Sequence, residues 1–172
     1  PSNKYRVELP PLNELKKANS TIEENEYVSS FDMNYLCTTT QLPGKQLNVL
    51  SREIGIGTKS IANGQVFAPI NLTFYLTEEY EIRKYFQYWM ECVVSQKVGE
   101  PMYAGYYKNY VLPVKMYQMN KGQLEDGLKD LYGIELIDAF PTSMEMIQLN
   151  NQAQTAPLEM TVSLSYKTYN IL

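Results

Sequence analysis

Histidine is absent from this chain of 172 residues, and its absence excludes several kinds of chemistry. Histidine is the usual general base of enzymes and the commonest metal ligand in proteins. Most hydrolase triads are therefore excluded. We expect a protein that is not an enzyme and that has no catalytic residue, no metal site and no cofactor.

Cysteine is scarce, because the chain contains only Cys37 and Cys92. The two residues match neither a CxxC motif nor the spacing of a zinc site. We predict that both are small buried hydrophobic side chains in a reducing compartment, rather than the two halves of a disulfide.

Long apolar runs are also missing, since no stretch approaches the roughly 18 residues that a membrane span requires. The first six residues, PSNKYR, lack the apolar core of a secretory signal. The sequence therefore predicts no membrane-spanning segment, and it predicts synthesis and folding in the cytoplasm.

Positive charge is outnumbered, because 15 Lys and Arg residues stand against 19 Asp and Glu residues, for a net charge of -4. Affinity for nucleic acid comes mainly from Lys and Arg, which displace counterions from the phosphates. We therefore do not expect this chain to bind DNA tightly.

Tyrosine is abundant, with 15 copies beside 5 Phe and 1 Trp. Its large apolar ring and polar hydroxyl suit the strands of a β-rich fold, protein interfaces and sugar-binding platforms. We interpret most of these residues as strand-facing side chains. The length and the 44% hydrophobic content fit a single domain over residues 1–172.

Two segments alternate between apolar and polar residues, as strands with one buried face do. They run from Leu158 to Tyr166 and from Ile70 to Leu76, and their polar faces carry mostly Asn, Ser and Thr. Shorter segments bring the prediction to about eight strands, mostly antiparallel. These are Tyr5–Leu9, Met33–Thr40, Leu47–Ile56, Val111–Met119, Ile134–Phe140 and Met144–Leu149.

One helix is predicted over residues 77–98. Thr77 is a suitable N-cap, the acidic residues after it favour a helix N-terminus, and Gly99 with Pro101 provides the stop. Apolar residues at helical spacing predict a stripe that packs against a sheet rather than a ligand site. The stripe consists of Ile82, Tyr85, Phe86, Trp89, Met90 and Val93.

Two connections are long for a compact β domain. Pro10 to Asp32 is polar and partly acidic, and Gly55 to Gln65 contains three glycines and few large apolar residues. Loops of this length are commonly functional, so we expect both to reach a neighbouring molecule. A third segment, Lys121–Tyr132, is predicted as a helical turn between strands.

Self-assembly is the architecture that these patterns favour. Unpaired strand edges attract other strands, and native proteins either protect such edges or use them to assemble. The two best strands carry little charge, which favours contact with copies of the same chain.

Five short motifs occur in an order that resembles the tail tube proteins of contractile-tailed (myovirus-type) bacteriophages. The resemblance spans nearly the whole chain, and its specificity lies in the ordered set. Pro10–Asp32 and Lys121–Tyr132 look like insertions. The motifs are a first strand at Tyr5–Leu9, a strand and Leu-Pro turn at Cys37–Gly44, a strand-to-helix passage at Leu72–Leu76 followed by Glu79, Arg83, Phe86 and Trp89, a late turn at Ala139–Ser143, and a closing strand at Leu158–Tyr166.

The resemblance implies a mainly β, antiparallel β-sandwich or barrel-like tail tube fold with one flanking α-helix and long interaction loops. It implies hexameric rings that stack into a tube, with four strands of each subunit lining an inner barrel for delivery of genomic DNA. The expected ring-stacking residues are Leu42, Pro43, Gly44, Ile54 and Ile56. The expected lumen wall is formed by Asn71, Thr73, Ser163 and Ser165, and the expected helix packing by Ile82, Phe86, Trp89 and Met90.

The implied partners follow from the same family. A sheath protein would surround the tube, and baseplate and tail terminator proteins would bind its ends. The tape-measure protein and genomic DNA would lie inside without tight binding. The implied location is the tail tube of a virion assembled in the bacterial host cytoplasm, either in a complete phage tail or in a headless injection device.

Two alternatives remain open at the level of sequence. One is a baseplate protein that initiates the tube and shares the same domain. The other is a β-sandwich module that binds a carbohydrate or a receptor through exposed tyrosines. The candidate tyrosines are Tyr103, Tyr106, Tyr107 and Tyr110.

Overall fold

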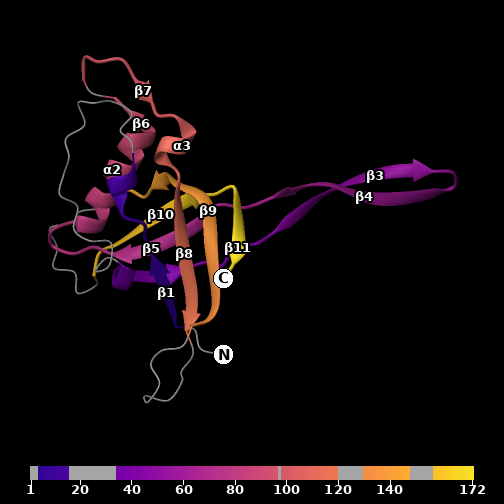
Figure 1. The fold of residues 1–172 in the computed structure, drawn as a ribbon, viewed down its shortest axis with the longest axis horizontal. Helices are drawn as coiled ribbons and strands as arrows, with labels where there is room; N and C mark the ends of the chain where they lie inside the picture. The colour runs from indigo at the N-terminus through magenta and orange to yellow at the C-terminus, as the bar shows by residue number, and fades with distance from the viewer. Residues whose placement is uncertain (1–3, 16–33, 97, 120–129, 148–156) are drawn as a thin grey trace.

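The computed structural model describes residues 4–15, 34–96, 98–119, 130–147 and 157–172. Two antiparallel sheets enclose the core, one helix closes a side of it, and a long hairpin projects far from this body (Figure 1). The predicted mainly β, antiparallel architecture with one main helix is therefore confirmed.

The two sheets share one strand. Sheet 1 is formed by β1 (Tyr5–Glu8), β8 (Leu112–Met119), the first half of β9 (Asp130–Met144) and β11 (Thr168–Ile171). Sheet 2 is formed by residues 140–144 of β9, then β10 (Glu159–Ser165), β5 (Ile70–Tyr75) and β2 (Cys37–Thr40). The neighbouring strands of each sheet are antiparallel.

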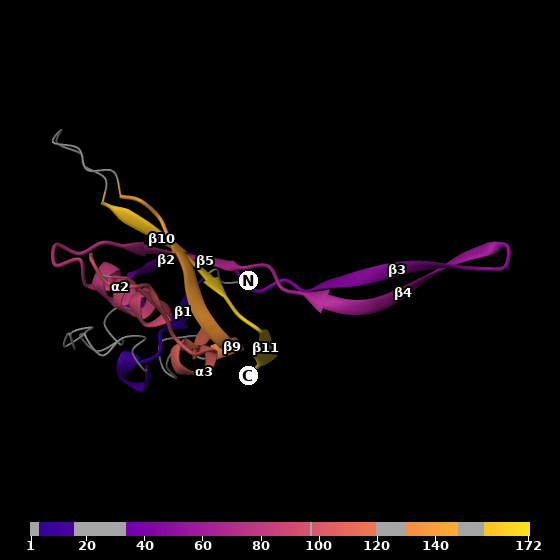
Figure 2. The ribbon, with the colours of Figure 1, turned by 90° about the horizontal axis from the view of Figure 1, so that it is seen from above.

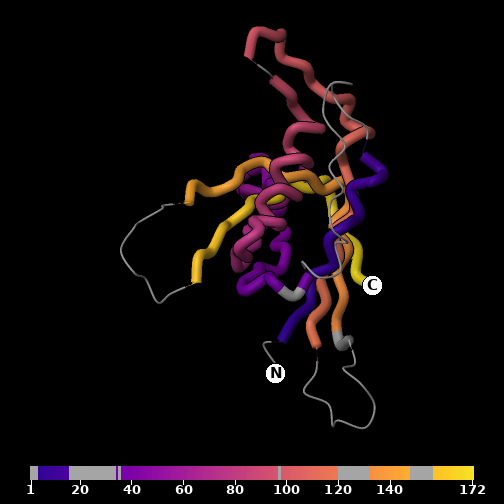
Figure 3. The backbone as a smooth tube through the Cα atoms, turned by 90° about the vertical axis from the view of Figure 1, so that its left-hand side faces the viewer, coloured from indigo at the N-terminus to yellow at the C-terminus, as the bar shows by residue number. Residues whose placement is uncertain are grey.

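Strand β9 crosses from one sheet to the other. Its first half pairs with β8 and β11, and residues 140–144 pair with β10. The change of direction lies at Asp138, whose φ of 55° is unusual for a residue other than glycine. Figure 3 shows the second half of β9 leaving the first sheet together with β10.

The strand predicted at Ile134–Phe140 is confirmed as part of β9. The turn predicted at Ala139–Ser143 is wrong, and so is a separate strand that begins at Met144. One strand runs through this segment to Met144, because Phe140, Pro141 and Ser143 keep their pairing with β10 past the bend. Residues 145–147 follow outside the strand, and 148–149 lie outside the described residues.

The alternation predicted for β5 and β10 is confirmed. Ile70, Leu72 and Phe74 are buried on β5, and Met160, Val162 and Leu164 are buried on β10. Strand β11 was missed by the sequence analysis, because its four residues are too few to show a period.

The main helix, α2 (Glu81–Val93), is shorter than the predicted 77–98. Thr77 is not its N-cap: the backbone turns from Thr77 to Tyr80, and Tyr80, with φ of 53°, occupies the cap position. The helix ends at Val93 because the next residues, β6 (Val94–Ser95), pair with β7 (Tyr103–Ala104). Gly99, with φ of 83°, therefore lies between β6 and β7 and not at the helix end.

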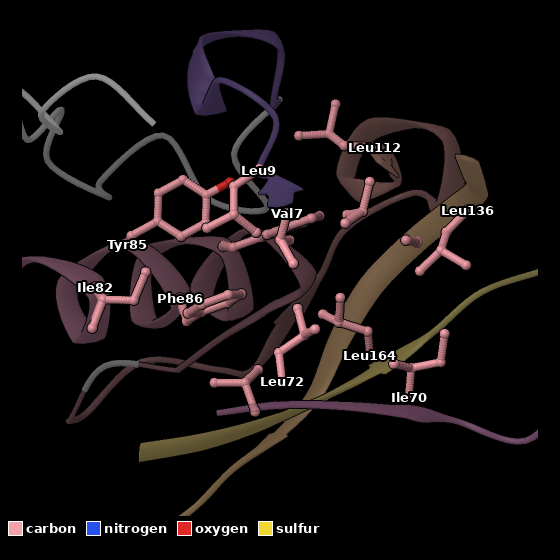
Figure 4. Packing of buried hydrophobic residues seen from close by; sticks show 14 of the residues in the cluster. Val7, Leu9, Ile70, Leu72, Ile82, Tyr85, Phe86, Leu112, Leu136 and Leu164 are labelled. Carbon is pink, nitrogen blue, oxygen red and sulfur yellow. The ribbon is translucent and has the colours of Figure 1, made fainter. Parts of the chain in front are cut away.

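The packing of α2 confirms Ile82, Phe86 and Trp89 as core residues. The Phe86 ring lies 5.5 Å from that of Phe74, and the Trp89 indole donates a 2.7 Å hydrogen bond to the Tyr110 carbonyl. Figure 4 shows helix side chains directed toward those of both sheets. Met90 was predicted in the core and is only half-buried, whereas Tyr88 and Cys92 are buried instead.

The predicted extended insertion over Pro10–Asp32 begins as packed structure. The 3-10 turn η1 (Leu12–Glu14) and the residue after it bury Leu12 and Leu15, and the Tyr85 hydroxyl donates a 2.6 Å hydrogen bond to the Pro10 carbonyl. Residues 16–32 lie outside the described part. A second 3-10 turn, η2 (Asn34–Leu36), leads into β2.

The helical turn predicted at Lys121–Tyr132 falls mostly outside the described residues. Its last three residues belong to β9 and are strand, not helix. The short helix α3 (Tyr107–Tyr110) precedes β8 and was not predicted.

We expect Phe86→Ala to lower the free energy of unfolding by roughly 3–5 kcal/mol, because it leaves a cavity between α2 and β5. Urea unfolding followed by the fluorescence of Trp89 measures this as a lower midpoint. Lys84→Ala, at an exposed position of the same helix, is the control and should change stability by less than about 0.5 kcal/mol. Equal effects of the two variants would contradict the packing described here.

Candidate functional site

A two-stranded arm is the most exposed feature of the described residues. It consists of β3 (Gln46–Ile54) and β4 (Gly57–Val66), which pair antiparallel along their whole length. The arm continues outward from β2 and β5 and projects far beyond the body (Figure 2). The loop predicted from Gly55 to Gln65 is therefore wrong: most of it is the strand β4, because hairpin pairing supplies the backbone hydrogen bonds that a loop would lack.

The arm ends in a tight turn. Ile54 pairs with Gly57, which leaves Gly55 and Ile56 as a two-residue loop, and Gly55 has φ of 66°. A positive φ at the first of two loop residues is typical of the turns that join antiparallel strands. The three glycines seen in the sequence thus belong to hairpin geometry, with Gly64 beside a register shift between the strands.

Every residue of β3 and β4 is exposed, including the apolar ones. Contiguous apolar patches of this kind are rare on monomeric soluble proteins and mark contact sites. An isolated two-stranded hairpin is also marginally stable at best in water. The arm is therefore a candidate contact surface, and its exposed large apolar side chains are Leu47, Val49, Leu50, Ile54, Ile56, Ile61 and Val66.

The arm also places two cations opposite each other. Arg52 pairs in register with Lys59, and like charges directly opposite destabilise a strand pair. With Lys45 and Glu53, residues 45–66 are basic, whereas the rest of the chain holds 12 basic and 18 acidic residues. Residues 45–66 are thus opposite in net charge to the rest of the sequence.

The predicted ring-stacking residues do not form one cluster. Leu42 and Gly44 are exposed and Pro43 is half-buried at the root of the arm, between β2 and β3. Ile54 and Ile56 are exposed at the tip of the arm, and Ile54 is the last residue of β3. The length of the arm therefore separates two sets of residues that the sequence analysis had grouped together.

The predicted lumen residues lie on one face of sheet 2, the side turned away from the core. Asn71 stands opposite Ser163, whose hydroxyl donates a 2.6 Å hydrogen bond to the Asn71 side-chain oxygen. Thr73 stands opposite Thr161, with 3.3 Å between their hydroxyl oxygens. We call this the hydroxyl face; by register it comprises Thr39, Asn71, Thr73, Tyr75, Ser143, Glu159, Thr161, Ser163 and Ser165.

The two sheets differ in charge on their outer faces. On the hydroxyl face, Glu159 is the one charged residue among those nine positions. Sheet 1 carries ion pairs instead: Arg6 lies 3.1 Å from Glu8, and Lys115 lies 3.9 Å from Glu135. A molecule moving along the hydroxyl face would meet hydrogen-bonding groups and almost no fixed charge.

Each of the two outer strands of sheet 2 has one edge without a strand partner among the described residues. The sheet order ends at β2 on one side, and residues 140–144 of β9 pair with β10 alone on the other. Pro141 lies in that segment and has no N–H to donate, which fits an edge position.

A groove of about 470 Å³ lies beside that segment of β9. Among the described residues, Glu91 is the one charged group on its lining, and its carboxylate accepts a 3.3 Å hydrogen bond from Gln87. The other walls are Met90, Val93, Val94, Phe140, Pro141, Thr142 and Met144. The half-buried position of Met90 is explained by this groove.

The cysteines are not joined by a disulfide. Cys92 is buried as predicted, whereas Cys37 is half-buried on the edge strand β2. Desolvation raises the pKa of the Cys37 thiol to about 11, partly opposed by hydrogen bonds from Tyr5 and to Thr39. The thiol is thus protonated and weakly nucleophilic at neutral pH.

The tyrosines considered for sugar binding do not form a flat platform. Tyr107 and Tyr110 pack edge-on against each other and against Phe140, with ring centroids 5.3–6.4 Å apart. Tyr106 is exposed beside them. This arrangement is an aromatic cluster anchored to β9 and does not resemble a stacking site.

Within the described residues, no group of three His, Cys, Asp or Glu side chains could hold a metal ion. Their helices are too short or too polar to span a bilayer.

Three features escaped the sequence analysis: the pairing of Arg52 with Lys59, the groove, and the unpaired edge of β9. The first could have been found from the Ile54–Gly57 turn, which fixes the hairpin register. The other two depend on the bend at Asp138, for which the sequence carries no clear signal.

The sequence of this chain matches a known protein family. A sequence model of the family described as phage tail tube protein matches residues 1–172. No curated protein matches the chain.

Solved structures with a similar fold come from contractile machines. A chain of the PVC sheath/tube terminator of an extracellular contractile injection system, in the extended state, has 10% identity, a TM-score of 0.61, and coverage of 100% of this chain and 95% of that one. The tube-terminating cap of the anti-feeding prophage has 11% identity, a TM-score of 0.61, and coverage of 100% of this chain and 89% of that one. A chain of the PVC sheath-tube complex in the extended state has 11% identity, a TM-score of 0.57, and coverage of 100% of this chain and 90% of that one. At these identities the likeness concerns the fold.

Proposed function

This chain belongs to the phage tail tube protein family, and we propose that its copies form six-membered rings that stack into a tube for DNA delivery within a contractile sheath. In this proposal the protein is a structural subunit and not an enzyme. The observation that carries it is the arm, whose apolar side chains are all exposed in the single chain.

Burial of the apolar side chains of the arm would supply the free energy of stacking. Full burial of a Val, Leu or Ile side chain contributes roughly 1.5–3 kcal/mol. Even at half that gain, the arm side chains would contribute an amount comparable to the roughly 4–15 kcal/mol cost of association. Each subunit within a stack would also donate one arm and receive another, so the contacts accumulate along the tube.

The wall of the lumen is assigned in this proposal to sheet 2. Each subunit would contribute β9, β10, β5 and β2, and the unpaired edges of β2 and β9 would meet those of neighbouring copies. About 24 strands at roughly 4.8 Å spacing and about 40° tilt close a barrel on the order of 48 Å across at the backbone. Roughly 35–40 Å would remain between side chains, which is wide enough for duplex DNA.

The chemistry of the hydroxyl face supports its place in the lumen. DNA binds tightly where Lys and Arg displace counterions from its phosphates. The face of Asn71, Thr73, Ser163 and Ser165 offers hydroxyl and amide groups in place of cations. DNA could therefore move along it without being held.

The partners follow from this arrangement. A sheath protein would surround the tube, terminator and baseplate proteins would bind its two ends, and the tape-measure protein would occupy the lumen before the genome does. The protein would be located in the virion, in a tail assembled in the cytoplasm of the bacterial host.

We expect Ile54→Glu and Ile56→Glu to leave the monomer folded and to abolish tubes, because both side chains are exposed in the chain and would be buried on stacking. Circular dichroism checks the fold, and negative-stain electron microscopy counts tubes as concentration rises. Val98→Glu, at an exposed site outside the arm, is the control and should retain tubes. Normal tubes from both arm variants would count against the role of the arm, and wild-type rings that never elongate would point to a tube initiator.

We expect Asn71→Lys to leave tube formation intact but to make the tubes retain short duplex DNA in low salt. The substitution would place a ring of cations in the lumen, and the retention should fall steeply as salt rises. A filter-binding assay with labelled duplex DNA measures this. Asn170→Lys, the same change at an exposed position of sheet 1, is the control. Retention by the control alone would contradict the choice of the lumen face.

A further inference from the structure

The groove between α2 and β9 is open in the single chain, and its neighbour, the edge at residues 140–144, has no strand partner in the described structure. We propose that this groove receives the Leu42–Lys45 segment of the adjacent copy in the same ring, with Leu42 as the side chain that enters it. The proposal rests on the proposed ring and names the contact that makes its junction specific.

Strand direction is the first argument. The order β9, β10, β5, β2 contains three antiparallel steps, so β2 runs opposite to β9. When copies repeat this order around a ring, β2 of one copy meets β9 of the next in antiparallel orientation. The two unpaired edges can therefore complete each other without any change in the fold.

The direction of the Leu42 side chain is the second argument. On β2, Thr39 pairs with Thr73 of the hydroxyl face, and Thr40 pairs with the buried Leu72. Continued alternation turns Leu42 toward the side of Thr40, which is the side covered by α2. An exposed Leu42 on the edge of one copy would thus face the groove wall of the next.

The chemistry of the two surfaces is the third argument. Leu42 is 55% exposed, and the groove offers the apolar side chains of Met90, Val93 and Phe140. The two surfaces also carry opposite charges, because the groove has the carboxylate of Glu91 and the entering segment has Lys45. The groove therefore fits a short apolar segment that ends in a cation.

The pairing of β2 in one copy with β9 in the next would need a contact that fixes how the two strands align. Strand β2 has four residues, and Pro141 removes one donor from the β9 edge. Backbone pairing over so short an edge specifies register weakly. A leucine seated in a groove would fix the register of each junction and thereby the closure of the ring.

The test is a charge exchange between the two surfaces. We expect Leu42→Glu alone and Val94→Lys alone to reduce rings and tubes at least tenfold, and the double variant to restore them. Val94 lines the groove and is 44% exposed, so the substitution to Lys should be tolerated by the fold. Met102→Lys, 66% exposed and outside the groove lining, is the control and should assemble normally. Analytical ultracentrifugation and electron microscopy measure assembly, and circular dichroism confirms the fold of each monomer.

A cross-link gives a second readout that does not depend on loss of assembly. We expect Leu42→Cys combined with Val94→Cys to give, on oxidation, a ladder of covalent species up to a closed ring. The wild type, in which the Cys37 thiol is protonated and Cys92 is buried, supplies the background.

The outcomes separate the two proposals. A wild-type protein that never forms rings would overturn the proposed function. Wild-type rings that are retained in both single variants, with no cross-link ladder, would overturn only the groove contact. Rescue of Val94→Lys by Ile56→Glu instead of Leu42→Glu would also overturn it, because the groove would then hold the arm tip.

Discussion

The proposed assembly depends on a pair of strands that, among the described residues, has neither a third strand nor a core to pack on. Along β3 and β4 the backbone is paired, but both faces of the ribbon are exposed and carry large apolar side chains. An isolated ribbon of this kind is marginally stable at best in water. In the proposed function, neighbouring copies supply the rest of its stability.

The body of the molecule is organised in the opposite way. Core residues from both sheets and from α2 are fully buried, so the body holds its shape without a partner. Among the described residues, sheet 2 has an open edge at β2 and another at residues 140–144 of β9, where β9 turns away from sheet 1. There the bend at Asp138 leaves a strand edge and a groove open side by side. A rigid body with an exposed arm and open sheet edges is suited to repeated assembly.

Much of this could be predicted from the sequence where the signal is local. The alternation in β5 and β10 and the stripe of Ile82, Phe86 and Trp89 follow from burial of one face, and the structure bears them out. Asn71 and Ser163 were expected on the polar faces of two strands, and the structure joins them by a hydrogen bond that the sequence analysis had not predicted. The start of the helix was misplaced because Tyr80 adopts a left-handed backbone conformation that few residues other than glycine adopt. The arm was taken in part for a loop, because glycines and small polar residues mark turns and exposed hairpins alike.

The central claim is that the arm is stabilised by neighbouring copies and not by its own chain. Hydrogen–deuterium exchange of the amides in residues 46–66, measured on dilute monomer and on assembled tubes, tests it most directly. The account predicts rapid exchange in the monomer and protection increased by at least about a hundredfold in the tube, while the amides of β5 and β10 stay protected in both. Equal protection of the arm in monomer and tube would contradict it.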